Sequence, residues 1–470
     1  MQELKVDQKE LEKRVKHVVS LSKEIPWYVR KYKELGIDPD EIRSPQDLLK
    51  AYEKGLYTTP EDLPELVYYE DKNTKEFYTS GISGKKPKRV CMNRDDEKRI
   101  VNQAMKFFQK FYTKNDRILN CFPAPPAISG HMENCALSAL GYAYKHAPAQ
   151  ELRGDPRKFM EYYNEFKPTS LASLTTFAYR LPKLLETIGI DSRKLEINTI
   201  MVSGEPSTIQ RRKEIGKEFE ARVCDFYGTS ESGMVAYEVE PFTDEFIVTL
   251  PETLLFLVKN GGQVSTGEIG NVLLTNLYEV NSKPWTVLLN YQIGDWAKCI
   301  EKEKNEPITS ISEIRREVAD LSGAKLHPQE VEEVVEELEE HEKELTGEYT
   351  LIDFKTIPRE VVYTFIRQGI ELDEELLEKL RNDPNTYKNW DRKSEVEIRV
   401  ESTYKLSSEK NEEINKKIRE KLYASNIPVK TLVEIIGDAR LFIEAEDPGE
   451  LYKGFRKLIK PGKPKRLIVV

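Results

Sequence analysis

The chain has 470 residues, of which 39% are hydrophobic and 33% are charged, and its formal net charge is −9. This length is too great for one ordinary hydrophobic core, so we expect two domains, or one large composite body and a smaller one. The acidic balance argues against nucleic acid as a partner, since phosphate backbones attract excess Lys and Arg. The first residues are polar, and no apolar run approaches the length of a membrane span, roughly 20 residues. We therefore expect a cytoplasmic protein without a membrane partner.

The first 56 residues are predicted to be helical, because valines and leucines recur at helical spacing on a polar background. Gly36 follows an apolar-rich run and is a candidate helix C-cap. Ser44 and Pro45 resemble an N-cap followed by proline at the first helical position, which predicts a further helix there.

From residue 66 onward, short apolar, β-branched runs alternate with helical stretches. Strands that alternate with helices indicate an α/β body. Glycine-containing turns between residues 245 and 301 predict an added antiparallel β unit. The predicted strands are residues 117–122, 197–202, 222–227, 254–258 and 272–277, and the predicted helices are residues 181–188 and 209–219.

The C-terminal part is predicted to be a small α+β domain. Residues 328–345 are predicted to form a helix, because their apolar residues recur at a spacing that puts them on one helix face. The glutamates between them would face solvent. Strands at residues 349–354 and 396–400 and a helix at residues 409–422 follow. The charged residues 355–395 look like an insertion within this domain.

The chain has five cysteines, and no two of them form a CxxC pair. We therefore expect neither a zinc site nor a disulfide framework. This cysteine usage is typical of a reducing cytoplasm. The five residues are Cys91, Cys121, Cys135, Cys224 and Cys299.

The first segment with a chemical character is FYTSGISGKKPK, residues 77–88. Glycines let backbone N–H groups close around phosphate oxygens, hydroxyls add donors and lysines add charge. The segment is not a Walker loop, because Gly81 and Gly84 are too close together and no Ser or Thr follows the lysine. An exposed basic turn is the alternative interpretation.

Three further segments contain residues that suit a nucleotide. In DFYGTSESG, residues 225–233, Tyr227 could stack on a base and Glu231 could hold Mg²⁺ near phosphates. In YQIGD, Asp295 could bind a ribose diol through two hydrogen bonds. In GKPKR, residues 462–466, a lysine could reach a phosphoryl or carboxylate centre. The alternatives are a turn with a buried Tyr, an ordinary Gly-Asp turn and a flexible basic tail.

Taken together and in order, these segments resemble the acyl-adenylate-forming superfamily, specifically its phenylacetate–CoA ligase-like branch. Residues 25–63 resemble the short helical N-terminus of that branch, and residues 168–231 match its central block. Residues 291–295 resemble the ribose-binding motif, and residues 323–332 resemble the start of the C-terminal domain. Residues 462–466 fit the terminal Gly-Lys-x-x-Arg.

The resemblance implies a set of residues that bind ATP or AMP. The phosphate loop would hold the β- and γ-phosphates through Thr79, Ser80, Gly81, Ser83, Gly84 and one lysine, either Lys86 or Lys88. The nucleotide would also be bound in and around its adenine pocket by Ser203, Gly204, Glu205, Pro206, Asp225, Phe226, Tyr227, Gly228 and Thr229.

The resemblance also implies the catalytic residues. Ser230 takes the place of the usual threonine near the α-phosphate, and Glu231 would bind Mg²⁺. Asp295 would hold the ribose hydroxyls. Lys463 would contact the carboxylate and the α-phosphate during adenylation.

The implied fold is α/β. A large adenylate-forming body, layered α/β with the added β unit, would span residues 1–316. A small, mobile α+β lid domain would span residues 317–470. The family hinge falls at Glu317, and Arg315 would be the ribose-binding arginine with a one-residue shift.

The implied activity is the ATP-dependent conversion of a small carboxylic acid to an acyl-adenylate, followed by acyl transfer to coenzyme A. The acid is left open, and so is the oligomeric state, with a homodimer as one option. An adenylating enzyme that acts on a cofactor or carrier protein without CoA is one alternative. A non-catalytic nucleotide or acyl-adenylate binding protein is another, favoured by Ile82 and Ile293, which replace the usual hydroxyl residues. His131 lies where the branch has its acyl-pocket loop, and a substrate contact or a structural role fits it equally.

Overall fold

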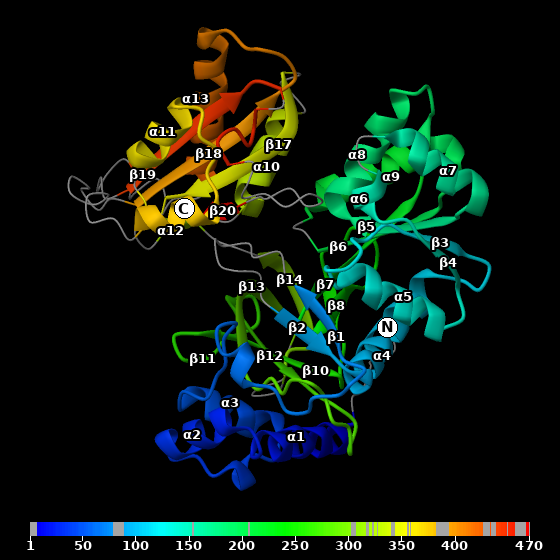
Figure 1. Cartoon of the computed structure of the whole chain (residues 1–470), viewed down its shortest axis with the longest axis vertical. Coiled ribbons are helices and arrows are strands. Elements are labelled where there is room, and N and C mark those ends of the chain that lie inside the picture. Colours follow the sequence, from blue (N-terminus) through cyan, green and yellow to red (C-terminus); the bar gives the residue numbers. More distant parts are fainter. Residues whose placement is uncertain are drawn as a thin grey trace. The chain divides into compact units, whose positions relative to one another are not determined.

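The computed structural model describes residues 7–78, 89–152, 155–204, 207–301 and 307–315 of the larger N-terminal part. In the C-terminal part it describes residues 319–321, 324–326, 328–339, 344–354, 357, 359–381, 394–425, 433, 439–448, 450–455 and 467–469. The chain divides into two compact units, with the break between Ile314 and Arg315. Figure 1 shows the helices and strands of both units.

The N-terminal unit begins with the predicted helices α1 (Gln8–Ser22), α2 (Pro26–Leu35) and α3 (Pro45–Glu53). The predicted caps are confirmed, since Gly36 ends α2 with a φ of 62° and the Ser44 side chain accepts a hydrogen bond from the backbone N–H of Asp47. The three helices share one apolar core with β10 (Thr253–Lys259), β12 (Ile269–Asn276) and β13 (Tyr291–Glu301), beside which they lie in Figure 1.

A 12-stranded sheet forms the body of this unit, in the order β11-β10-β12-β13-β14-β9-β8-β7-β6-β5-β3-β4. Its parallel half contains β3 (Arg117–Asn120), β4 (Ala143–His146), β5 (Ser170–Leu174), β6 (Thr199–Ser203) and β7 (Arg222–Thr229). The remaining strands are β8 (Gly233–Glu238), β9 (Phe246–Val248), β11 (Gly262–Gln263) and β14 (Ser310–Arg315) together with β10, β12 and β13. The predicted antiparallel β unit is therefore present, and it continues the same sheet.

Helices cover both faces of the parallel half. Successive residues of a strand point to opposite faces, and Met201 and Val202 of β6 accordingly belong to different cores. Met201 packs with α4 (Arg94–Phe111) and α5 (Ser129–Ala139). Val202 packs with α7 (Pro156–Phe166), α8 (Thr175–Glu186) and α9 (Ile209–Phe219). This is a layered α/β body, as predicted.

The shorter elements of this unit connect those layers. They are η1 (Pro39–Glu41), η2 (Leu63–Glu65), α6 (Ala149–Leu152), η3 (Ser192–Leu195) and the hairpin of β1 (Lys75–Tyr78) with β2 (Arg89–Met92). The prediction for α9 is confirmed, whereas the helix predicted at residues 181–188 begins earlier, at Thr175, because the helix continues through Pro182.

The C-terminal unit has a four-stranded sheet in the order β19-β18-β17-β20. Its strands are β17 (Leu345–Asp353), β18 (Ser394–Ser402), β19 (Ala439–Glu446) and β20 (Leu467–Val469), and a small pair is formed by β15 (Ala319–Leu321) and β16 (Ala324–Leu326). Leu351 packs with α10 (Pro328–Glu339) and α13 (Ser408–Ser425), whereas Ile352 packs with α11 (Arg359–Arg367) and α12 (Glu374–Arg381). This unit is α+β, as predicted.

One prediction for the C-terminal unit needs correction. The helix predicted at residues 328–345 is too long, because α10 ends at Glu339 and β17 begins at Leu345. The segment 355–395, predicted to be an insertion within the domain, contains α11 and α12, whose apolar faces form a core with β17 and β20. That it is an insertion stays a prediction.

Within the described ranges, no helix has the length and apolarity that crossing a membrane requires. The five cysteines, all of which are described, are free thiols.

Candidate active site

The predicted nucleotide motifs lie at the ends of neighbouring parallel strands. β6 ends at Ser203, which lies opposite Phe226 of β7. The Ser203 hydroxyl donates a hydrogen bond to the backbone carbonyl of Phe226 at 2.6 Å. Open α/β sheets bind ligands at the carboxyl ends of their strands, so the two motifs converge on the edge where a ligand is expected.

Gly204, directly after β6, has a left-handed backbone with a φ of 82°. A Cβ atom at this position would lie 2.9 Å from Cδ2 of Leu174, closer than normal contacts allow. The left-handed backbone therefore favours glycine, and a larger residue would also have to displace the Leu174 side chain.

A tight turn joins β7 to β8 and carries Ser230 and Glu231. Thr229 pairs with Gly233 across the hairpin, and the Thr229 hydroxyl accepts a hydrogen bond from the N–H of Ser232 at 3.0 Å. α4 holds the same turn from outside, since Arg99 and Gln103 donate to the carbonyl of Ser232. The turn is thus fixed by contacts within the hairpin and with a helix.

The Glu231 side chain is partly buried and contacts β13. Its Oε1 accepts a hydrogen bond from the Tyr291 hydroxyl at 2.9 Å, and its backbone carbonyl accepts one from Asn276 at 2.9 Å. Burial and the nearby Glu231 carboxylate raise the pKa of Tyr291 far above its usual range. The Tyr291 phenol therefore stays protonated and acts as a donor to Glu231.

A second contact joins β7 itself to β13. Tyr227 is buried, and its hydroxyl donates to Oδ2 of Asp295 at 2.7 Å across 68 residues of sequence. Gly294, just before Asp295, has a φ of 95°, a conformation that favours glycine. The structure therefore brings together Tyr227, Glu231 and Asp295, three residues assigned to the nucleotide from the sequence.

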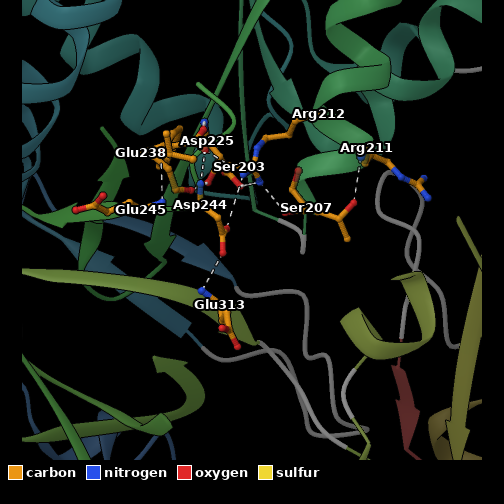
Figure 2. Close-up of polar contacts among 12 residues, drawn as sticks. Ser203, Ser207, Arg211, Arg212, Asp225, Glu238, Asp244, Glu245 and Glu313 are labelled. Atoms are coloured by element: carbon orange, nitrogen blue, oxygen red, sulfur yellow. Dashed lines mark hydrogen bonds and ion pairs between the residues drawn. The ribbon is translucent and has the colours of Figure 1, made fainter. Parts of the chain in front are cut away.

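Asp225 belongs to a buried charge cluster on β7, β8 and α9 (Figure 2). Arg212 lies 3.4 Å from Oδ2 of Asp225, 3.0 Å from Oε1 of Glu238 and 3.7 Å from Oδ1 of Asp244. The backbone N–H of Glu313 on β14 donates to Asp244 at 3.0 Å. The Arg212 guanidinium thus contacts β7 through Asp225, and it is linked to β14 through Asp244.

Burial sets the protonation of these carboxyls. It raises the pKa of Glu238 above its usual range, and the charge of Arg212 opposes that shift. It also raises the pKa of Asp244, opposed by hydrogen bonding from Glu313 and by Arg212. Arg212 is fully buried, so the carboxyls compensate a charge that water does not reach.

Several predicted site residues lie outside the described residues, namely Thr79, Ser80, Gly81, Ser83, Gly84, Lys86, Lys88, Glu205, Pro206, Glu317 and Lys463. Arg315 is the last residue of β14, and its side chain is not described either. The phosphate-loop prediction falls between β1 and β2, where Tyr78 pairs with Arg89 and Arg89 forms an ion pair with Glu76.

The sequence-based assignment missed three residues that hold the site. Tyr291 was recognised only as the start of the YQIGD motif, Asn276 carried no motif, and Arg212 lay in an ordinary helix pattern. A polar side chain on a face that otherwise reads as buried is the signal that could have identified Arg212.

The chemistry of the donors fits a hard divalent cation. Glu231 offers a carboxylate, and the adjoining Thr229 and Ser230 offer hydroxyl oxygens. Mg²⁺ prefers such oxygen ligands and is commonly bound through one carboxylate together with substrate phosphates.

The chain matches no protein-family model and no curated protein by sequence. It is similar to the solved structure of 2-hydroxyisobutyryl-CoA ligase in the postadenylation state with 2-HIB-AMP, with a TM-score of 0.70 and 16% identity over 98% of this chain and 89% of that one. It is also similar to O-succinylbenzoate coenzyme A synthetase from Bacillus subtilis in complex with ATP and magnesium, with a TM-score of 0.51 and 16% identity over 78% of this chain and 65% of that one. The layered body, the α+β C-terminal unit and these similarities lead to one conclusion: the chain has the fold of the acyl-adenylate-forming CoA ligases.

Proposed function

We propose that the protein activates a small carboxylic acid with ATP to form an acyl-adenylate and then transfers the acyl group to coenzyme A. The observation that carries this proposal is the pair of hydrogen bonds from Tyr227 to Asp295 and from Tyr291 to Glu231. These bonds connect β7 and the turn after it with β13, the two segments that contain the residues proposed for adenine, Mg²⁺ and ribose. The similar CoA ligases support the same reaction at the level of the fold.

In the first half-reaction, an oxygen of the acid forms a bond to the α-phosphorus of ATP, and the bond from that phosphorus to the pyrophosphate oxygen breaks. Mg²⁺, bound through Glu231, would neutralise negative charge on the phosphates. Asp295, oriented by Tyr227, holds the ribose, and Gly204 lets the backbone approach the nucleotide closely. Lys463 contributes a positive charge at the carboxylate and α-phosphate.

In the second half-reaction, the thiolate of coenzyme A attacks the acyl carbon and AMP leaves with the electron pair of the broken carbon–oxygen bond. The thiol proton passes to solvent. The nucleophile comes from the acceptor, so none of the five cysteines of the chain is required. We place this step after a rotation of the C-terminal unit about a hinge at Glu317.

The test is pyrophosphate release from Mg-ATP across aryl, short-chain and medium-chain acids, with and without coenzyme A. Wild type is compared with Lys463→Ala, and Lys405→Ala serves as the control because the Lys405 side chain is 83% exposed in the same unit. Loss of one charge-stabilising donor typically lowers the rate by about 10²–10³-fold, and we expect that loss only for Lys463→Ala.

Each outcome of the assay distinguishes one function. Acid-dependent release that collapses in Lys463→Ala supports adenylation, and a thioester formed with coenzyme A supports the ligase. Release without any effect of coenzyme A would favour an adenylating enzyme with another acceptor. ATP binding without release for any acid would refute the ligase and favour a binding protein.

A further inference from the structure

Three side chains that can bind a metal converge at the contact between α4 and α5. Nε2 of His131 lies 2.9 Å from Oε1 of Glu97 and 3.4 Å from Sγ of Cys135. The three ligand atoms all lie within 4.8 Å of one another. They come from two helices, and the same nitrogen of His131 is the nearest ring atom to both partners.

The helix geometry explains this convergence. His131 and Cys135 are four residues apart on α5, so both point to the same face of the helix. Glu97 lies in the first turn of α4, which packs against α5. The ring of Phe77 on β1 stacks on His131 with ring centroids 5.1 Å apart, which fixes the orientation of the imidazole.

The two separations that involve His131 suit a tetrahedral zinc ion, and the Glu97 and Cys135 ligand atoms lie within 4.8 Å of each other. Zn–N and Zn–O bonds of about 2.0–2.2 Å and a Zn–S bond of about 2.3 Å place tetrahedral ligand atoms about 3.3–3.6 Å apart. The separations of 2.9 and 3.4 Å around His131 need adjustments of only a few tenths of an ångström. One thiol, one imidazole and one carboxylate form a ligand set that zinc accepts, with a fourth position left for solvent.

One cation already lies beside this cluster. Nζ of Lys75 is 2.6 Å from Oε1 of Glu97 and 3.5 Å from Nε2 of His131. The Lys75 side chain is 48% exposed, so its ammonium can turn into water.

We propose that Glu97, His131 and Cys135 form a zinc-binding site that joins α4 to α5 beneath the β1–β2 hairpin. Phe77, which packs on His131, lies two residues before the start of the predicted phosphate loop. The bound ion would therefore fix the imidazole of His131, on which Phe77 of β1 packs, and β1 leads into that loop. This site goes beyond the proposed ligase activity, which does not require it.

The experiment measures metal binding by the full-length protein in the absence of nucleotide. Protein treated with a chelator is titrated with Co²⁺, whose visible bands and thiolate charge-transfer band report tetrahedral coordination by sulfur, and zinc is then measured by displacement of the cobalt. We expect one equivalent of metal. We also expect Cys135→Ser to lose the charge-transfer band and Glu97→Gln to weaken binding by about tenfold or more.

Two further variants make the result decisive. Cys91→Ser, in β2, is the control for other thiols and keeps the full signal. Lys75→Ala removes the competing ammonium without removing a ligand, so it binds the metal more tightly than wild type. If neither wild type nor Lys75→Ala gives a charge-transfer band, or if the band survives Cys135→Ser, the cluster is a charge network and the proposal is wrong. Neither result depends on acyl-adenylate formation, so the proposed function is tested independently.

Discussion

Single hydroxyl groups orient both carboxylates of the candidate site. The Tyr291 phenol is buried, neutral and directed at Glu231, and the Tyr227 phenol is buried and directed at Asp295. A neutral donor leaves the negative charge of a carboxylate in place, whereas a lysine would compensate it. The Tyr291 hydroxyl therefore restrains the Glu231 side chain without adding a positive charge beside it.

The first prediction removes one of these hydroxyls. Tyr291→Phe leaves Glu231 without its donor, and hydrogen bonds to charged groups contribute about 1.5–3 kcal/mol. We expect acid-dependent pyrophosphate release to fall by roughly 10- to 100-fold, with a higher Mg²⁺ concentration needed for half-maximal rate. Steady-state kinetics over a Mg²⁺ series measure both effects.

Tyr237→Phe is the matched control, because Tyr237 is also buried on the sheet and has no role in the proposed site. Its kinetics should match those of wild type. An unchanged Mg²⁺ dependence in Tyr291→Phe would show that this hydroxyl does not position the metal ligand.

Asp116 gives a prediction for acid stability. Its carboxylate accepts hydrogen bonds from the Thr113 N–H and hydroxyl and from the hydroxyls of Thr169 and Ser170. Burial alone would raise the pKa of Asp116, but these donors outweigh burial and hold it below its usual range. A carboxyl with a lowered folded pKa stabilises the protein above the unfolded pKa, and that stability is lost as pH falls through the folded pKa.

We therefore expect Asp116→Asn to lower the free energy of unfolding by about 2 kcal/mol at pH 7. The difference from wild type should shrink below the ordinary carboxyl pKa, where wild type loses the same contribution. Urea unfolding at neutral and acidic pH measures it. Asp191→Asn is the contrast, because Asp191 is only partly buried, pairs with the exposed Arg193 and caps η3 in a way that Asn can also do, so its replacement should change little. A difference for Asp116→Asn that is independent of pH would contradict the linkage.

At the scale of elements, Arg212 ties α9, β7, β8 and β14 into one cluster. Arg212→Met leaves Glu238, which is fully buried, without its cation. Breaking a buried pair in this way costs about 3–5 kcal/mol. We expect a loss of that size in urea unfolding, and we expect Arg212→Met combined with Glu238→Gln to recover part of it, because the second change removes the uncompensated charge. Strictly additive losses would show that the two groups are not coupled.

The elements differ in how far a sequence can specify them. Among the parallel strands, β3, β6 and β7 were predicted from their apolar runs, whereas β4 and β5 were missed. α4 was missed, although Asn93 and Asp96 form a capping box at its start. The predicted helix at residues 328–345 was extended too far because its glutamates continue beyond Glu339 without a stop signal such as glycine.

The sequence indicated which residues belong to the candidate site, but not which of them contact one another. Tyr227 and Asp295 were each identified from local motifs, yet their contact forms only in the folded sheet, where β14, β9 and β8 lie between β7 and β13 in the strand order. A single sequence contains no information on such pairing across 68 residues. Arg212 was missed for the same reason, because its partners lie on strands that follow it by different distances along the chain.

At the scale of the whole molecule, the proposed hinge lies at the border between the two compact units. The described residues proposed to bind the nucleotide lie in the N-terminal unit, except Arg315, and the break between units, at Ile314 and Arg315, lies at the end of β14, which the Arg212 cluster anchors through Glu313. A rigid anchor next to a break between compact units is what a hinge needs, because rotation is then concentrated in a few residues. Glu317 lies in that short stretch.

The last prediction tests this hinge. Proline fixes φ near −65° and removes a backbone donor, so Glu317→Pro restricts backbone rotation, whereas Glu317→Ala removes only the side chain. We expect Glu317→Pro to lower CoA-dependent thioester formation by about tenfold or more while changing acid-dependent pyrophosphate release much less, because only the second half-reaction follows the rotation. Glu317→Ala should resemble wild type in both assays. Equal loss of the two half-reactions in Glu317→Pro would argue that the residue supports folding or nucleotide binding, and equal retention would place the hinge elsewhere in the chain.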